Sequence, residues 1–171
     1  RLRAKLPLPE RVATTDLVHA VARRASEAGL SFYFLGASEE VNARAVEAIR
    51  KAYPKLKIAG RRNGYISEAE EEGVIAEINA ARPDILWIGM GVPLEQRFVS
   101  RNIDRLTNVG VIKTSGGLFD FLSGKNSRAP GWMQAAGLEW VYRAWLEPKR
   151  LGVRYLTTNP AAISALIRHS A

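Results

Sequence analysis

Asp84-Ile-Leu-Trp-Ile-Gly89 is the stretch of sequence that decides the fold. It is an apolar run between an aspartate and a glycine, and such a run is typical of a strand that is covered on both faces. Helix and strand patterns alternate on both sides of it along the chain. This alternation predicts an α/β fold in which a mostly parallel sheet is flanked by helices.

The segment before this strand contains three helical patterns and two strand patterns. Each helix has a start or stop signal, namely a capping residue, a glycine or a proline. We expect a helix capped by Thr14 or Thr15 and ending at Gly29, a strand at Ser31–Gly36, and a helix from Glu39 to about Tyr53. A weak strand at Lys57–Ala59 then leads to a turn at Arg61–Gly64, and a helix with a Ser67/Glu70 capping box runs to about Ala81. The residues expected to face inward are Val41, Ala45, Val46 and Ile49 on the second helix and Val74, Ile75 and Ile78 on the third.

The segment after this strand changes character near Gly124. Pro93 is expected to open a helix, and Val109–Lys113 is expected to form a strand that Gly116-Gly117 breaks. The helix would carry Phe98, Val99 and Ile103. From Pro130 to Ala171 there is no strand pattern, and two or three appended helices rich in Trp, Tyr and Arg are expected. We therefore expect an α/β body at 1–124 and a basic, aromatic helical appendage at 125–171.

The composition is that of an ordinary globular protein, and it excludes some kinds of site. The 171 residues are 47% hydrophobic and 25% charged, and none is a cysteine. Disulfides and thiolate metal sites are thereby excluded, and the only histidines, His19 and His169, are far apart in the sequence. No apolar run reaches the roughly 18 residues that span a bilayer, and no signal peptide is visible, so a cytoplasmic location without a metal site is expected.

The net charge of +8 is concentrated toward the C-terminal end. From Phe121 onward seven basic residues stand against two acidic ones, which gives 7 − 2 = +5 over the last 51 residues. Such an end is compatible with nucleic acid, an anionic lipid or a phosphorylated substrate. Nucleic-acid binding rests on charge alone, because no helix-turn-helix or RNA-type aromatic platform accompanies it, and it is not expected.

Three loops follow the carboxyl ends of predicted strands, where ligands bind in open parallel sheets. In the first, Gly36 would let the backbone approach a ligand, and the start of the next helix would offer free N–H groups. Such a helix start favours a phosphate by up to about 1 kcal/mol per charge at exposed sites. An ordinary strand-to-helix turn explains the same residues.

The second and third loops offer polar side chains beside glycines. In the second, Gly91 is followed by Glu95 and Gln96, whose side chains suit sugar hydroxyls, although Glu95 could simply complement the helix dipole. In the third, Gly117 could make room for a base or ribose, and Asp120 could accept hydrogen bonds or only form a turn. None of the three loops matches the GxGxxG or P-loop pattern, so dinucleotide and ATP binding are disfavoured.

The appendage combines aromatic residues with arginines. Arg143, Arg150 and Arg154 recur at spacings of seven and four, which can place them on one helical face. Such a face suits a membrane interface or a lipid diphosphate, whereas solvated arginines on a packed helix explain the same pattern.

A series of motifs from about Pro9 to Pro160 is similar to one known family. It comprises Arg11-Val-Ala-Thr-Thr-Asp-Leu17, Phe34-Leu-Gly36, Asn63-Gly-Tyr65, Pro83-Asp-Ile-Leu-Trp-Ile-Gly89, Gly91-Val-Pro-Leu-Glu-Gln96, Gly116-Gly-Leu-Phe-Asp-Phe-Leu-Ser-Gly-Lys125, Arg128-Ala-Pro-Gly-Trp-Met133, Gly137-Leu-Glu-Trp140, Glu147-Pro-Lys-Arg150 and Arg154-Tyr-Leu-Thr-Thr-Asn-Pro160. In this order they resemble the WecG/TagA/CpsF glycosyltransferases, which build bacterial teichoic acids, enterobacterial common antigen and exopolysaccharides.

The resemblance implies an enzyme that transfers a sugar from a UDP-sugar to an undecaprenyl-diphosphate-linked saccharide, with inversion and without a metal or cofactor. It also implies a Rossmann-like body and a C-terminal appendage that meets the inner face of the cell membrane. By matching position, the donor would lie near Arg11, the nucleotide near Tyr65 and Asp120, and the sugar near the Pro-Leu-Glu-Gln loop. The lipid diphosphate would face Arg143, Arg150 and Arg154, and apolar surface on the appendage is also compatible with a homo-oligomer.

Among the departures of this chain from the family pattern, two bear on the catalytic base and on the sugar contact, and others lie at Thr14 and at Lys113-Thr-Ser115. The aspartate that serves the family as catalytic base falls upstream of Arg1, so the chain is expected to be part of a longer protein, and a non-catalytic nucleotide-sugar-binding module is the alternative. In addition, the family has Gln then Glu after the proline loop, whereas Glu95 precedes Gln96 here.

Overall fold

The computed structural model describes residues 12–136, 138–146, 148, 158, 160, 164, 165 and 168; Ala135 and Arg143 are described by their backbone alone. The chain divides into two compact units, and the larger one is Val12–Asn126. The described residues that follow Asn126 belong to the other unit.

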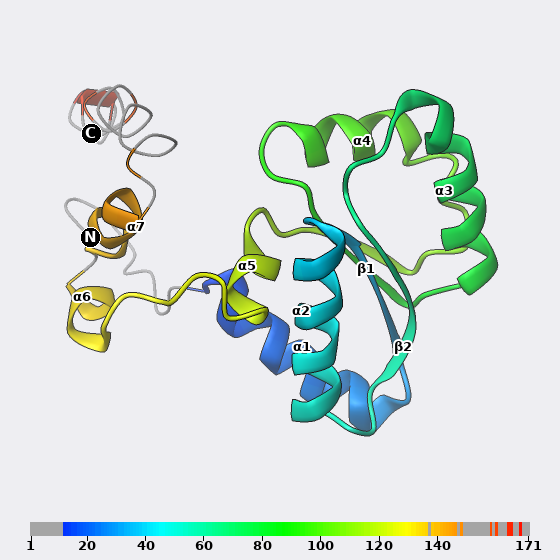
Figure 1. The fold of residues 1–171 in the computed structure, drawn as a ribbon, viewed down its shortest axis with the longest axis horizontal. Coiled ribbons are helices and arrows are strands. Elements are labelled where there is room, and N and C mark those ends of the chain that lie inside the picture. The colour runs from blue at the N-terminus through cyan, green and yellow to red at the C-terminus, as the bar shows by residue number, and fades with distance from the viewer. Residues whose placement is uncertain are drawn as a thin grey trace. The chain divides into compact units, whose positions relative to one another are not determined.

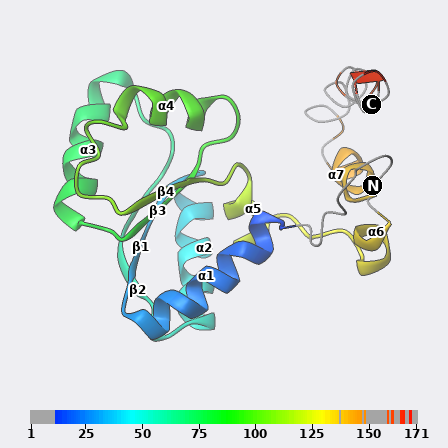
Figure 2. The ribbon, with the colours of Figure 1, turned by 180° about the vertical axis from the view of Figure 1, so that it is seen from behind.

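The larger unit is built on one four-stranded sheet with the order β2-β1-β3-β4 (Figure 2). All three pairs of neighbouring strands run parallel. The order places β3, the strand on which the sequence analysis rests, in the interior of the sheet. The strands are β1 at Ser31–Gly36, β2 at Lys57–Arg62, β3 at Ile85–Gly89 and β4 at Val111–Thr114.

Helices cover both faces of this sheet (Figure 1). Helices α1, α2 and α5 pack on one face, and α3 and α4 pack on the other. In this unit the helices are α1 at Thr14–Ala28, α2 at Glu39–Ala52, α3 at Glu68–Ala81, α4 at Leu94–Asn102 and α5 at Leu118–Leu122. The predicted α/β class, with a parallel sheet between helices, is confirmed.

The core has two layers, because the side chains of β1 and β3 point alternately to the two faces of the sheet. Phe32, Phe34 and Trp87 belong to the cluster under α1, α2 and α5. Their neighbours Tyr33 and Leu86 belong to the cluster under α3 and α4, because successive side chains of a strand point to opposite faces. Trp87 is only 1% exposed, so β3 is covered on both faces as its sequence predicts.

Several predicted boundaries are confirmed by the local geometry. Gly29 ends α1 in the left-handed conformation, with a φ of 71°. Ser67 and Glu70 form the predicted capping box at the start of α3, and Tyr53 follows the last residue of α2. The predicted inward faces of α2 and α3 are buried; they comprise Val41, Ala45, Val46, Ile49, Val74, Ile75 and Ile78.

Two predictions near α1 and β2 are wrong. Thr14 already belongs to the first turn of α1, and Ala13 occupies the capping position without a side-chain cap. The expected turn at Arg61 is instead the end of β2, because Arg61 and Arg62 pair with Phe34 and Leu35 of β1. Pairing with an interior strand thus extends β2 beyond the part that its own sequence suggests.

The ends of α4 and β4 also differ from the prediction. Ile103 is 50% exposed, because α4 ends at Asn102 and the buried side chain there is that of Asn102. The amide of Asn102 donates to the Phe98 carbonyl and to Glu71 of α3, at 3.0 and 2.6 Å. Strand β4 begins at Val111 rather than Val109, because pairing with β3 starts at Ile85 opposite Val111.

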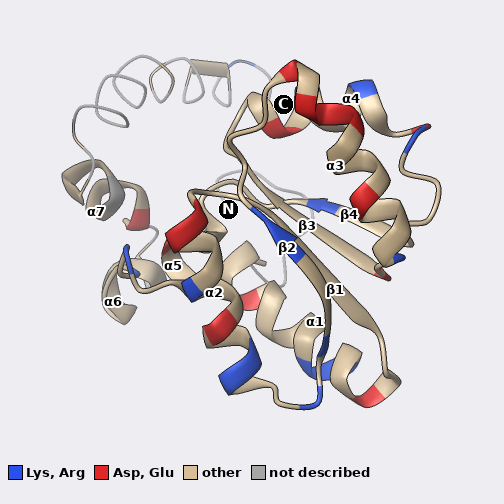
Figure 3. Ribbon diagram, turned by 45° about the vertical axis from the view of Figure 1, so that its right-hand side comes forward, with Lys and Arg blue, Asp and Glu red and all other residues tan. Residues whose placement is uncertain are grey.

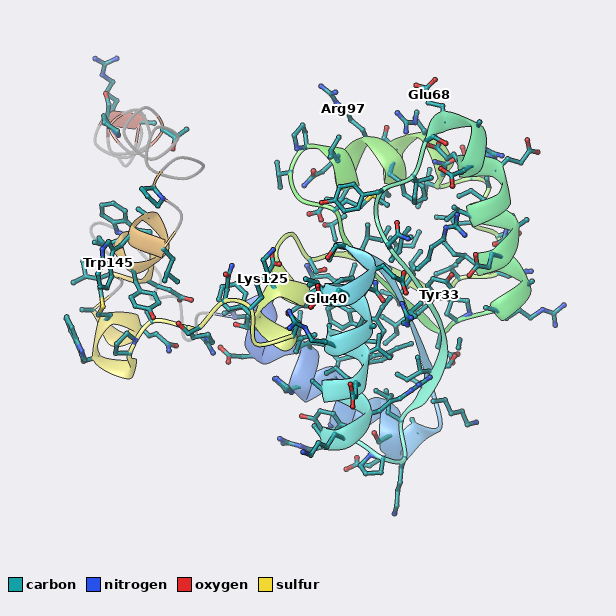
Figure 4. The ribbon with its side chains drawn as sticks, viewed as in Figure 1. Tyr33, Glu40, Glu68, Arg97, Lys125 and Trp145 are labelled. Carbon is teal, nitrogen blue, oxygen red and sulfur yellow. The ribbon has the colours of Figure 1, made fainter. Side chains whose placement is uncertain are left out.

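Polar contacts tie β1 and β2 to α3, on which acidic residues gather (Figure 3). The Tyr33 hydroxyl donates to Glu77 at 2.5 Å, and Arg62 donates to the other oxygen of Glu77 at 3.2 Å. Burial of the phenol and the neighbouring Glu77 carboxylate raise the pKa of Tyr33 well above its ordinary value (Figure 4). Gly60 of β2 makes room for the ring, since a Cβ there would lie 2.5 Å from Cε2 of Tyr33.

The amino-terminal edge of the sheet is held by a contact between Ser31 and Asp84. The Ser31 N–H and hydroxyl both donate to one carboxylate oxygen of Asp84 at 2.7 Å. In return, the Asp84 N–H donates to the Ser31 hydroxyl oxygen at 3.2 Å. These hydrogen bonds, led by the one from the hydroxyl, lower the pKa of Asp84 below its ordinary value.

Replacing Ser31 with alanine should destabilise the fold in a pH-dependent way. We expect Ser31→Ala to cost about 1 kcal/mol of unfolding free energy at neutral pH, where the Asp84 carboxylate is charged. Because the pKa of Asp84 is lowered in the folded state, its stabilising contribution is complete above the unfolded pKa and is lost as pH falls through the folded pKa. Urea titrations of both proteins from pH 7 to pH 3 should therefore converge at low pH, and a constant difference would contradict the assignment.

Candidate functional site

The candidate site is the carboxyl-terminal edge of the sheet, where β1 and β3 both end in glycine. Gly36 and Gly89 lie side by side as the last register pair of the two strands. The loops that follow the four strands lead into α2, α3, α4 and α5. In parallel sheets this edge is the one at which ligands bind.

The backbones at this edge approach so closely that no side chain fits between them. A Cβ on Gly36 would lie 2.8 Å from the Cα of Gly89, and one on Gly64 would lie 2.8 Å from the Cα of Gly36. Gly36 also has a φ of 142°, which L side chains rarely adopt. The structure thus gives Gly36 a packing role; that it lies against the donor stays a prediction.

Backbone hydrogen bonds join these loops to one another. The Ala37 N–H donates to the Gly89 carbonyl at 2.9 Å, and the Gly64 N–H donates to the Ala37 carbonyl at 2.8 Å. The N–H and hydroxyl of Ser115 both donate to the Ile88 carbonyl at 2.7 Å. The loops after β1 and β4 are therefore bonded to the end of β3, and the loop after β2 is bonded to the loop after β1.

Asn42, in the first turns of α2, holds the ends of β1 and β2 together. Its side chain is fully buried, and its amide nitrogen donates to the carbonyls of Phe34, Gly36 and Arg62 at 3.2, 2.9 and 2.9 Å. The sequence analysis missed this residue. A signal was present, because Asn42 is a polar residue directly after Val41 on the otherwise apolar face of the helix.

Glu95 and Gln96, adjacent in the sequence, lie in different surroundings. Glu95 is only 3% exposed, and its two carboxylate oxygens accept hydrogen bonds from the Gly116 N–H at 2.9 and 3.2 Å. Gln96 is exposed in the first turn of α4. Gly91, in the same loop, has a φ of 83° and no atom within 4 Å of the position its Cβ would take.

The loop after β4 leads into the short helix α5, which carries Asp120. Gly117 precedes the first residue of this helix, and the half-buried Asp120 forms an ion pair with Lys125 at 3.2 Å (Figure 4). A backbone hydrogen bond also spans the end of this helix, because the Asn126 N–H donates to the Asp120 carbonyl at 2.9 Å. Asp120 thus lies in a short helix and pairs with Lys125, and its contact with a nucleotide stays a prediction.

Tyr65, a candidate donor residue, lies in the loop after β2. Its side chain is 80% exposed, and its N–H donates to the Asn63 side-chain oxygen at 3.1 Å. Arg61 donates to Glu39 at 2.5 Å across the same loop, and this hydrogen bond is the main cause that lowers the pKa of Glu39. An exposed ring in a braced loop is available to stack on a ligand.

The remaining predicted site residues cannot be placed. Arg11, Arg150 and Arg154 lie outside the described residues, and Arg143 lies within α7, Glu139–Leu146, with its side chain not described. Among the described residues no group of three His, Asp or Glu side chains is arranged to hold a metal ion.

The described part of the second unit contains two short helices, α6 at Gly131–Ala135 and α7. Arg128 donates to Gln134 at 2.7 Å, and Gln134 donates to the Ala129 carbonyl at 2.7 Å, which holds the turn before α6. No helix in the part of the chain that the structure describes is long and apolar enough to cross a bilayer. Large apolar side chains on this unit are nevertheless exposed, among them Trp132, Trp140 and Trp145 (Figure 4).

The parallel sheet, flanked by helices on both faces, and the paired glycines at its carboxyl edge define a Rossmann-like α/β fold. The chain belongs to the glycosyl transferase WecG/TagA/CpsF family, whose model matches residues 1–171. The family resemblance stated from the motifs is thereby confirmed.

Three relatives share the name N-acetylglucosaminyldiphosphoundecaprenol N-acetyl-beta-D-mannosaminyltransferase. The protein from Bacillus spizizenii W23 is 31% identical over 163 residues, which cover 95% of this chain and 62% of the relative. The one from Bacillus subtilis 168 is 34% identical over 143 residues, which cover 84% of this chain and 55% of the relative. The one from Staphylococcus aureus MRSA252 is 30% identical over 150 residues, which cover 88% of this chain and 58% of the relative. The chain thus spans little more than half the length of these relatives.

Two glycine-to-alanine substitutions should have opposite effects on stability. Gly36→Ala places a methyl group against the Gly89 backbone at a positive φ, so we expect a loss of about 3 kcal/mol of unfolding free energy or more. Gly73→Ala, in the middle of α3 with open space around it, should instead gain about 0.5–1 kcal/mol. Chemical denaturation of both variants tests this, and a tolerated Gly36→Ala would refute the close-packed edge.

Proposed function

We propose that this chain is the larger, donor-binding part of a glycosyltransferase. The enzyme would move a sugar from a UDP-sugar to a polyprenyl-diphosphate-linked saccharide during synthesis of a bacterial cell-surface polysaccharide. The observation that carries the proposal is the family match over all 171 residues. The relatives' shared name makes N-acetylmannosamine the first sugar, and N-acetylglucosaminyl-diphosphoundecaprenol the first acceptor, to test.

The carboxyl edge of the sheet supports this proposal as a place for the donor. Tyr65 would stack on the nucleotide base, and Asp120 would accept hydrogen bonds from the ribose or base. Gly91 and Gly117 would let the backbone approach the donor, and Gln96 would contact the sugar. Arg11 would neutralise the donor diphosphate, since a guanidinium matches phosphate oxygens in charge and geometry.

The second unit would serve the lipid acceptor. We assign the acceptor diphosphate to Arg143, Arg150 and Arg154, and the membrane surface to the exposed aromatic side chains of the same unit. Tryptophan and arginine suit this interface, because their apolar parts can lie among lipids while their polar tips stay in water. On this basis the enzyme works as a peripheral protein on the cytoplasmic face of the cell membrane, with the body at 1–124 and the appendage at 125–171.

The reaction itself is proposed to invert the anomeric centre and to need neither metal nor cofactor. A direct displacement requires a base that accepts the proton of the acceptor hydroxyl, which is worth roughly 10²–10⁴-fold in rate. A non-catalytic nucleotide-sugar-binding module remains the second candidate, because the chain spans 62% or less of its three relatives.

Donor binding can be measured by calorimetry on the complete enzyme. We expect it to bind UDP-N-acetylmannosamine more tightly than ADP- or GDP-linked sugars, and Asp120→Asn to weaken UDP-sugar binding about tenfold or more. Asp104→Asn, at an exposed position after α4, is the matched control and should bind as the wild type does. A folded enzyme without affinity for any UDP compound would refute the proposed function.

Acceptor binding can be tested by reversing one charge of the appendage. Arg150→Glu should lower transfer to a lipid-diphosphate acceptor by roughly tenfold or more, because a carboxylate would repel the phosphates, while UDP-sugar affinity stays unchanged. Arg24→Glu, on an exposed face of α1, should leave transfer unchanged. Equal turnover of Arg150→Glu and the wild type would remove the acceptor role of the appendage.

A further inference from the structure

Glu95 is a buried carboxylate that accepts hydrogen bonds from the backbone of a neighbouring loop. Both of its oxygens accept from the Gly116 N–H, 21 residues further along the chain. No lysine or arginine among the described residues forms an ion pair with it at the distances that define a salt bridge. Burying a carboxylate to 3% exposure is costly unless it is hydrogen-bonded, and among the described residues the donor to the Glu95 side chain is the Gly116 N–H.

The residue that Glu95 holds controls the entry to α5. Gly116 has a φ of 56° and leads through Gly117 into the helix that carries Asp120. On its other side, Ser115 is fixed to the Ile88 carbonyl of β3. In this turn, Glu95 accepts the hydrogen bond that the Gly116 N–H donates. Removing the carboxylate would leave this half-buried N–H without its acceptor or shift the turn.

We propose that Glu95 is a positioning residue of the nucleotide-sugar site, an inference that rests on the proposed function. It fixes the loop after β4 to the start of α4, and it thereby sets the place of Gly117 and Asp120 relative to Gln96. The expectation that Glu95 contacts the sugar is replaced by a division of roles between two adjacent residues. Glu95 faces the protein, and the exposed Gln96 faces the donor.

The charge of Glu95 strengthens this hold. A carboxylate accepts a shorter and stronger hydrogen bond from a backbone N–H than a neutral acceptor does. A glutamine keeps the shape and one accepting oxygen, whereas an aspartate keeps the charge but is one methylene shorter and draws back from Gly116. The two conservative variants therefore separate positioning from a direct contact of the charge with a substrate.

The experiment uses the complete enzyme with Glu95→Gln, Glu95→Asp and Glu95→Ala, and with Glu27→Ala on the exposed face of α1 as control. Two quantities are measured, namely hydrogen exchange of the Gly116 amide and the kcat and KM for the UDP-sugar donor. We expect Glu95→Ala and Glu95→Asp to speed exchange at Gly116 and to lower kcat/KM about tenfold. Glu95→Gln should keep Gly116 protected and stay within about threefold of the wild type. If Glu95→Ala does not fold, the pair of Gln and Asp variants decides.

Three results would overturn the positioning role in an active enzyme. One is unchanged Gly116 exchange in both the alanine and aspartate variants, and another is unchanged donor kinetics when Gly116 has lost protection. The third is a Glu95→Gln variant that is as impaired as Glu95→Ala although Gly116 stays protected, since the charge would then contact the substrate directly. A wild-type enzyme that neither binds nor transfers a UDP-sugar fails differently, because it refutes the proposed function whatever the exchange at Gly116.

Discussion

The close approach of β1 and β3 at Gly36 and Gly89 is the constraint on which the rest of the structure depends. It allows two strands to end side by side without a side chain between them, and Gly64 packs onto the same point. The loops that follow can then bond to these strands through the backbone alone. The contacts that hold this edge together are all made within the chain.

Much of the fold could be predicted from sequence because its signals are local. The apolar run at β3, the glycine after α1 and the capping box of α3 each act within a few residues, and all three are confirmed. The end of β2 could not be predicted in this way. Arg61 and Arg62 have the sequence of a turn, and only pairing with Phe34 and Leu35 of an interior strand makes them part of the sheet.

The candidate site was predictable in its location but not in its internal contacts. Strand ends followed by glycines mark the edge, because ligands bind at the carboxyl ends of parallel strands. The partners of Asn42 and Glu95 lie up to 20 and 21 residues away on other loops, and no periodicity encodes them. A polar residue at a buried position shows that some partner exists, while only the packed structure identifies it.

Asn42 and Glu95 together show how this edge separates structure from recognition. Both side chains are buried and hydrogen-bonded to the backbone: Asn42 donates to a carbonyl at the end of β1, and Glu95 accepts from the Gly116 N–H. The exposed side chains lie beside these contacts, Tyr65 in the loop after β2 and Gln96 in the first turn of α4. Such an arrangement allows the exposed residues to change with the ligand while the backbone frame stays fixed. Position 95 requires a side-chain acceptor for the Gly116 N–H, which a glutamate or a glutamine supplies, whereas the exposed position 96 has no such requirement.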